Sequence, residues 1–221
     1  LFDNAILDSS FIRQILTSRF IRVCSTLPLN IHMKDIYKDW HKTFPGSGQG
    51  KQYPYLLEKI KDNHRMYKHP HKERWTHILD YGCGKGGTMT WLMGLTPNLT
   101  IDGYDPGHTD YSNTETLKRK YDAIYTADVM EHIEEEDLEQ TILEQQSLAN
   151  YNIHIIDLTP AKKRLPDGRN AHVTLLDLET WRWHLEAPGT HETVDMRTWT
   201  IPDPNYNTRS RLCCILKNIR K

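Results

Sequence analysis

The stretch HILDYGCGKGGTMTWL, residues 77–92, decides how the rest of the sequence is interpreted. Apolar side chains surround Asp80 in a run typical of a buried strand, four glycines follow within six residues, and apolar residues resume at helical spacing from Met89. This pattern predicts a strand, a tight turn and a helix. Glycine allows positive φ and leaves no Cβ to hold a ligand away from the backbone, so the turn is a candidate cofactor cradle.

Length and charge limit the class of protein. The chain has 221 residues, 38% of them hydrophobic, and a formal net charge of −1. The single glycine turn favours one α/β domain over two small ones. A charge near zero argues against a surface that attracts nucleic acid everywhere, although local basic patches remain open. No apolar run has the length of a bilayer span and the first residues lack a secretory layout, so we expect a soluble, cytoplasmic protein with no membrane partner.

The four cysteines show neither a C-x-x-C pair nor zinc spacing. Cys213 and Cys214 are adjacent in the candidate strand RLCCILK, where alternation predicts that they face opposite sides of a sheet. We expect reduced thiols that serve packing.

Residues 1–32 differ in character from the rest of the chain, and they precede the first methionine, Met33. They are either an amphipathic leading helix or an extraneous extension. Residues 33–221 are expected to form a single domain, with a helical cap at about 33–75. The cap has predicted helices at 35–44 and 54–64, joined by a glycine-containing loop that is either a lid over a ligand or a plain connector.

Strand and helix patterns alternate through the rest of the chain. Strands are predicted at 99–104, 121–127 and 152–158, helices at 134–150 and 176–185, and two closing strands at 191–200 and 211–219. We expect an α/β fold of three layers, helix, sheet and helix. The sheet is predicted to be mostly parallel, with an antiparallel last strand.

Asp105 stands at the end of the second predicted strand, about 20 residues beyond the glycine turn. A carboxylate at that place in a mononucleotide-binding unit accepts hydrogen bonds from ribose hydroxyls. The glycine turn and the spaced acid together predict a nucleoside-containing cofactor.

The motifs ILDYGCGKGG, DGYDP and YDAIYTADVMEHI, in this order and spacing, resemble the class I, Rossmann-like, S-adenosylmethionine-dependent methyltransferases, in the branch with D-x-G-x-G-x-G and D-V-x-E-H motifs. The resemblance implies that Asp80 lies near the cofactor amino group, that Asp105 binds the ribose, and that Asp128 borders the reactive methyl group. The full set that it implies for cofactor binding is Asp80, Tyr81, Gly82, Cys83, Gly84, Gly86, Asp105, Pro106, Thr126, Ala127 and Asp128.

One competing match and one departure from the family pattern bear on this resemblance. Gly82, Gly84 and Gly87 also match G-x-G-x-x-G of nicotinamide enzymes, but Asp80 and the DVMEH stretch favour a methyltransferase. The segment from Asp105 to Tyr121 is too short for a full helix and strand, so the contact to the adenine amino group is unassigned. Asp110 and Glu115 there are either substitutes or local turn and cap residues.

Methyl transfer needs an in-line nucleophile, water exclusion and, for some acceptors, a base. Histidines and carboxylates near the later strand ends are the candidates: Glu131, His132, His154, Asp157 and His172. We expect His132, Asp157 and His172 to be catalytic.

Asp128 and Glu131 have two interpretations. They are either the N-cap and capping-box partner of the next helix, or part of a metal site. For a metal, Asp128, Glu131 and His132 would share one helical face, and His172 would complete an oxygen and nitrogen set suited to Mg²⁺ or Mn²⁺. A similar acid-x-x-Glu-His set with a distal His occurs in the metal-dependent methyltransferases of small-RNA 3′ ends, and related residues occur in quinone-pathway O-methyltransferases.

The acceptor is the open question. Trp181 and Trp183 lie on different helical faces, so one packs while the other lines a pocket or lies at the surface. The KKRLPDGR loop, 162–169, either recognises an anionic acceptor or is a solvated loop. Our leading hypothesis is methyl transfer to an oxygen or nitrogen of a small molecule. The alternatives are a metal-assisted nucleic-acid methyltransferase, a non-catalytic cofactor-binding module and a nicotinamide enzyme.

Overall fold

The computed structural model describes residues 46, 48–64 and 74–220. The predicted leader at 1–32, the predicted helix at 35–44 and the basic residues Arg65, Lys68 and Lys72 lie outside these ranges. The described residues belong to one compact unit. None of its described helices is both long enough and apolar enough to cross a membrane.

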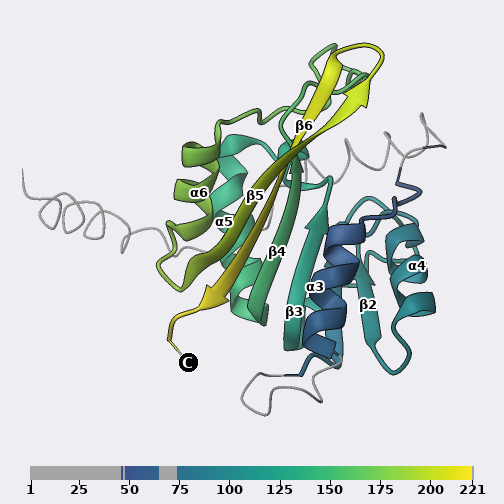
Figure 1. Cartoon of the computed structure of the whole chain (residues 1–221), viewed down its shortest axis with the longest axis vertical. Coiled ribbons are helices and arrows are strands. Elements are labelled where there is room, and N and C mark those ends of the chain that lie inside the picture. The colour runs from purple at the N-terminus through teal and green to yellow at the C-terminus, as the bar shows by residue number, and fades with distance from the viewer. Residues whose placement is uncertain (1–45, 47, 65–73, 221) are drawn as a thin grey trace, which may run out of the picture. The chain divides into compact units, whose positions relative to one another are not determined.

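Six strands form one sheet in the order β2-β1-β3-β4-β6-β5 (Figure 1). The strands β1 to β4 run parallel, and β6 is antiparallel to both of its neighbours. The strand bounds are β1 His77–Tyr81, β2 Thr100–Tyr104, β3 Tyr121–Ala127, β4 Ala149–Asp157, β5 His191–Asp203 and β6 Asn207–Asn218. The predicted α/β class with an antiparallel last strand is confirmed.

Helices cover the sheet on both faces. Their bounds are α3 Pro54–His64, α4 Gly87–Leu95, α5 Glu135–Leu148 and α6 Leu178–Glu186. One core holds Leu56 of α3 and Leu92 of α4 against one face of the sheet, and another holds Leu138 of α5 and Trp181 of α6 against the opposite face. Burial on both faces explains why the central parallel strands are almost continuously apolar.

The two adjacent cysteines of β6 lie on opposite faces of the sheet. Cys213 belongs to the core beneath α3 and α4, and Cys214 to the core beneath α5 and α6. Both are free thiols, and burial raises the pKa of each. The predicted packing role is consistent with these surroundings. Trp181 is likewise fully buried, whereas Trp183 is 55% exposed, as expected for side chains on different helical faces.

The chain between β2 and β3 contains no strand and only the 3-10 turn η1, Thr114–Lys118. Asn113 caps this turn by accepting a hydrogen bond from the Glu115 N–H, and the Glu115 carboxylate pairs with Lys118. The predicted shortening of this segment is confirmed, and Glu115 has a local role.

The structure corrects the interpretation in which Asp128 caps the next helix. Asp128 adopts a left-handed conformation with φ of 58°, the 3-10 turn η2 spans Met130–His132, and α5 begins only at Glu135. The N-cap of α5 is Glu134, which makes no side-chain cap bond. The capping-box interpretation is therefore wrong, as is the shared helical face. The apolar pattern of this helix also predicts Leu143 in the core, but Leu143 is 38% exposed.

Candidate active site

A cavity of about 1020 Å³ opens at the edge of the sheet where β1, β3 and β4 end. Because β6 is antiparallel, its first residues reach the same edge, and Arg211 lies opposite Asp157 in the register. The glycine turn contributes Gly82 and Gly84 to the wall, and the segments 46–55 and 161–172 contribute further residues. This edge is where ligands bind in open parallel sheets.

The glycine turn is held against the end of β2. The N–H groups of Gly82 and Cys83 donate to the Tyr104 carbonyl at 2.7 and 3.1 Å. Gly82, Gly84 and Gly86 have φ of 84°, 55° and 75°, which L side chains rarely adopt. The predicted strand, glycine turn and helix are all present.

Residues 48–51 pack directly on this turn. The Lys85 N–H donates to the Gly48 carbonyl at 2.7 Å, and the Lys51 N–H lies 3.1 Å from Thr88 Oγ1. A Cβ on Gly84 would lie 2.6 Å from Gly48 O, and one on Gly87 would lie 1.6 Å from Gln49 O. The glycines therefore admit a second backbone segment, which covers the turn as a lid would.

Asp80 lies in the cavity wall and is 3% exposed. Its Oδ2 accepts a hydrogen bond of 2.6 Å from the Tyr125 hydroxyl. Burial raises the pKa of this carboxyl to about 7, and the Tyr125 hydrogen bond opposes that rise. Asp80 therefore changes charge near neutral pH.

The remaining predicted cofactor residues divide into two groups. Cys83, Ala127 and Asp128 line the cavity together with Gly82 and Gly84. Asp105 does not line it, because its carboxylate accepts hydrogen bonds of 2.8 Å from the N–H groups of Gly84 and Gly107. The others outside the wall are Tyr81, Gly86, Pro106 and Thr126.

Two of these side chains have partners elsewhere. The Tyr81 hydroxyl donates to Glu144 of α5 at 2.7 Å. Thr126 Oγ1 lies 2.9 Å from Nδ1 of His154, and both residues are fully buried. His154, a candidate base from the sequence, is not part of the cavity wall.

Asp128 is held by two cations in the cavity wall. Its carboxylate pairs with Lys51 from the covering segment and with Arg211 from β6. Burial alone would raise the pKa of Asp128, but the positive charges of Lys51 and Arg211 outweigh burial and lower it. Asp128 is therefore ionised and locks the covering segment to the sheet.

Asp157 anchors two arginines of β6. Its Oδ2 lies 2.8 Å from Arg209 Nη2 and 3.2 Å from Arg211 Nη2, while Oδ1 accepts from the Thr159 N–H at 3.0 Å. Arg211 also lies over the Tyr53 ring at 5.9 Å. Of the predicted catalytic residues, Asp157 is thus the one engaged by two guanidinium groups.

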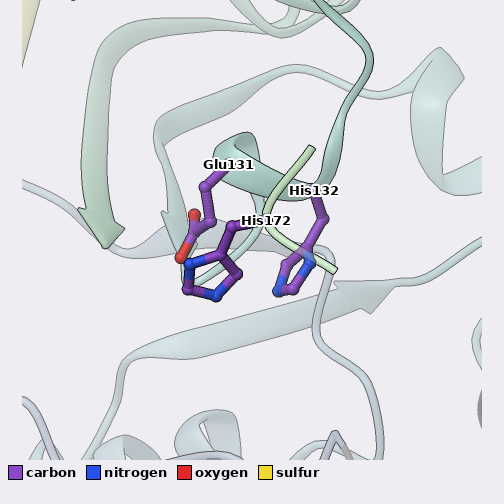
Figure 2. Close-up of side chains that lie close together, drawn as sticks. All are labelled: Glu131, His132 and His172. Carbon is purple, nitrogen blue, oxygen red and sulfur yellow. The ribbon is translucent and has the colours of Figure 1, made fainter. Parts of the chain in front are cut away.

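Glu131, His132 and His172 converge at one point of the site (Figure 2). One possible ligand atom from each lies within 4.8 Å of the others. Glu131 and His132 come from η2, and His172 comes from the loop before α6. The sequence prediction that these three side chains cluster agrees with this arrangement, whereas Asp128 lies outside the cluster.

Both histidines are oriented by backbone carbonyls. Nδ1 of His132 lies 2.7 Å from Ala171 O, and Nδ1 of His172 lies 2.5 Å from Thr159 O. In the neutral rings these contacts place the proton on Nδ1 and the lone pair on Nε2. Burial lowers the pKa of His132 to about 4 and also lowers that of His172, so both rings are neutral at pH 7.

Glu131 is fully buried, and only one of its two carboxylate oxygens accepts a hydrogen bond from the described residues. Its Oε1 accepts a hydrogen bond of 3.1 Å from the Asp157 N–H. Its Oε2 has no hydrogen-bond partner among the described residues. Burial, with the nearby charge of Asp128, raises the pKa of Glu131 well above its usual value. An unpaired buried oxygen beside two imidazoles fits a proton or a cation.

Sequence reasoning missed the cations of this site. Lys51 and Arg211 contact Asp128, from which they are 77 and 83 residues distant in the sequence, and no local sequence pattern predicts such pairs. One signal was present, since a charged residue just before the apolar LCCIL run of β6 needs a buried partner.

The comparisons with known proteins agree with this geometry. Residues 49–195 match the family model described as a methyltransferase domain. No curated protein matches the chain.

Solved structures share the fold at low identity. A SAM-dependent methyltransferase from Methanosarcina mazei is 12% identical with a TM-score of 0.54, over 76% of this chain and 99% of that one. The 1,6-didemethyltoxoflavin-N1-methyltransferase of Burkholderia thailandensis is 11% identical with a TM-score of 0.50, over 98% and 93%. The methyltransferase domain of bacterial CtHen1 is 14% identical with a TM-score of 0.50, over 75% and 95%. Because the family model covers most of its length, the chain belongs to the methyltransferase domain family and is an enzyme of the S-adenosylmethionine-dependent class.

Proposed function

We propose that the enzyme transfers a methyl group from S-adenosylmethionine to an oxygen or nitrogen of a small-molecule acceptor. The observation that carries this proposal is one continuous cavity, with the glycine turn and Asp80 in one part of its wall and His132, Asp157 and His172 in another. Its volume of about 1020 Å³ matches pockets that enclose a cofactor and a small ligand.

The residues of the glycine turn fit the methyl donor. Gly82 and Gly84 line the cavity, and the Asp80 carboxylate, once ionised, can accept hydrogen bonds from a cationic amino group. The sulfonium of the donor supplies an already activated methyl group. The protein must therefore bind the donor and the acceptor, orient them and exclude water. Lys51 and its neighbours contribute by covering the glycine turn.

His132 is suited to take the acceptor proton. It lines the cavity, it is neutral at pH 7, and the Ala171 carbonyl fixes the ring so that Nε2 is the basic nitrogen. His172, in edge contact with His132 at 4.9 Å between ring centres, has the same orientation by a carbonyl. Asp157 positions Arg209 and Arg211 instead of acting as a base.

A divalent cation at Glu131, His132 and His172 is the alternative to His132 as the base, because Nε2 of His132 would then ligate the cation. Oε2 of Glu131 supplies an unpaired buried oxygen, and both histidines donate their other ring N–H to carbonyls, as metal-ligating histidines do. Mg²⁺ and Mn²⁺ suit this oxygen and nitrogen set. A bound cation would polarise an acceptor hydroxyl and replace the proton on Glu131.

The same cluster favours one alternative, a metal-assisted nucleic-acid methyltransferase. The sequence resembles the small-RNA 3′-end enzymes in its acid-x-x-Glu-His set and distal His. The net charge of −1 favours a small acceptor, because phosphate-backbone binding relies on a positive surface.

Calorimetry followed by methyl-transfer assays tests the proposal. We expect the protein to bind S-adenosylhomocysteine and not NAD, and to label a small-metabolite extract with radioactive methyl from S-adenosylmethionine. Labelling of an RNA pool alone would favour the nucleic-acid alternative. Tight donor binding with no labelled product in either pool would support a non-catalytic module.

A further inference from the structure

We propose that the acceptor carries an anionic group, a carboxylate or a phosphate, which Arg209 and Lys162 bind at the β6 end of the cavity. This inference rests on the proposed small-molecule function and specifies its substrate class. It arises from how cations and carboxylates are distributed in the wall of the cavity.

Arg209 is a partly buried cation, and one nitrogen of its guanidinium lies outside hydrogen-bonding distance of the nearby carboxylates. Its side chain is 13% exposed, and Nε and Nη2 both contact Asp157 Oδ2, at 3.0 and 2.8 Å. Its Nη1 lies 3.9 Å from Asp203 Oδ2, beyond hydrogen-bonding distance. Since Arg209 lines the cavity, this nitrogen can donate to a ligand.

Basic side chains outnumber carboxylates in the wall of the cavity. Lys51 and Arg211 pair with Asp128, Arg209 and Arg211 share Asp157, and Lys162 pairs with Asp203 at 2.9 Å. In the whole wall six basic side chains face four carboxylates: Lys51, Lys162, Lys163, Arg197, Arg209 and Arg211 against Asp80, Asp128, Asp157 and Asp203. An anionic group of the acceptor would offset this excess of positive charge.

The topology places Arg209 away from the donor site. The glycine turn follows β1, whereas Arg209 belongs to β6, and β3 and β4 lie between these two strands (Figure 1). The His132 and His172 pair borders the cavity between η2 and the loop that carries Lys162. An acceptor anchored at Arg209 would extend toward the histidines, where its reactive group must lie.

Carboxylate and phosphate are the groups that this pair can recognise. A guanidinium N–H and a lysine ammonium both donate charge-assisted hydrogen bonds, and two donors can contact two oxygens of one anion. Lys162 is 46% exposed on its loop, so it can move from Asp203 to a ligand without loss of core packing. A neutral acceptor would leave the positive charge unbalanced.

Calorimetry with inorganic phosphate and with acetate tests this inference. The protein, saturated with S-adenosylhomocysteine and kept in chelator to exclude metal-bound anion, is titrated with each salt at fixed ionic strength. We expect saturable binding of at least one anion. Arg209→Gln should weaken that binding by about tenfold or more, which corresponds to about 1.4 kcal/mol, and Arg209→Lys should retain part of it.

Two further variants keep the result interpretable. Lys162→Gln changes an exposed loop side chain and should weaken anion binding severalfold with the fold intact. Arg182→Gln removes an exposed α6 arginine that pairs with Glu186 and should change nothing. Tighter binding of phosphate would identify a phosphorylated acceptor, and tighter binding of acetate a carboxylic acid.

The inference and the proposed function fail separately. Binding of S-adenosylhomocysteine without saturable binding of either anion would overturn the anionic acceptor and leave the methyltransferase proposal standing. Equal anion affinity in the wild type, Arg209→Gln and Lys162→Gln would also overturn it. Loss of donor binding in the wild type would instead contradict the proposed function.

Discussion

Arg211 of β6 forms an ion pair with Asp128, the residue after the end of β3, and its Nη2 lies 3.2 Å from Asp157 Oδ2 at the end of β4. One guanidinium, 5% exposed, thus joins three neighbouring strands at the cavity edge. Asp128 in turn holds Lys51, so the covering segment depends on the same contact.

Arg211→Gln should therefore be strongly destabilising. It leaves the buried Asp157 and the partly buried Asp128 with less compensation, a change that costs about 3–5 kcal/mol in buried pairs. Urea unfolding followed by circular dichroism measures this loss, and Arg182→Gln, which removes an exposed pair, should stay within about 0.5 kcal/mol of the wild type. A loss below about 1 kcal/mol in Arg211→Gln would contradict the role assigned to the ion pair.

Gly87→Ala should displace the covering segment. The added Cβ would lie 1.6 Å from Gln49 O, so the backbone of residues 48–51 must move, at a cost of about 1–3 kcal/mol. Gly94→Ala on α4 is the matched control, because its Cβ would meet nothing within 4 Å and alanine favours a helix by about 0.5–1 kcal/mol. Thermal unfolding should show opposite shifts for the two variants. Shifts of the same sign would argue against close packing of the cover.

Donor binding should depend on pH through Asp80. Burial raises its pKa to about 7, so the carboxyl is mostly neutral below that pH and ionised above it. A cationic amino group prefers the ionised form, and affinity for S-adenosylhomocysteine should fall by up to about tenfold per pH unit below 7. Calorimetry at pH 8, 7 and 6 measures this slope.

Tyr125→Phe supplies the control for that slope. The Tyr125 hydroxyl stabilises ionised Asp80 through its 2.6 Å hydrogen bond, so its removal should raise the pKa further and move the loss of affinity to higher pH. A pH-independent affinity in both proteins would exclude Asp80 from donor binding.

Metal dependence is tested by chelation and by the two histidines. We expect Mn²⁺ binding by calorimetry, and we expect His132→Ala and His172→Ala each to weaken it by about 10-fold to 100-fold. Thr88→Ala, a polar change in the cavity wall outside the cluster, should leave Mn²⁺ affinity unchanged. Full methyl transfer after exhaustive chelation would remove the metal from the proposal and leave His132 as a base.

The strands were predictable because their signals are local. The apolar run of β3 between polar flanks gave the bounds Tyr121–Ala127 that the structure shows. The glycine turn was also predictable, since its positive φ values are ones that glycine adopts far more readily than other residues. The prediction at Asp128 was wrong because a left-handed residue, which the sequence did not signal, interrupts the helical pattern.

The candidate site was predictable only in part. The grouping of Glu131, His132 and His172 came from an assumed helical face, which the structure does not contain, and from a family resemblance; the structure brings the three together. Sequence could not reveal that Glu131 accepts a bond from the Asp157 N–H, or that Arg211 reaches Asp128 across 83 residues. Such contacts depend on strand order and register, which a linear pattern does not contain.

The packing of residues 48–51 on the glycine turn has a consequence for how the sequence can vary. Gly84 and Gly87 exclude side chains because a second backbone lies against them, and Gly50 faces the same limit from the Thr88 N–H. Two segments some 37 residues apart in the sequence therefore constrain each other's substitutions. A larger residue on either side becomes acceptable only after a compensating change on the other, so these positions should vary together among homologues.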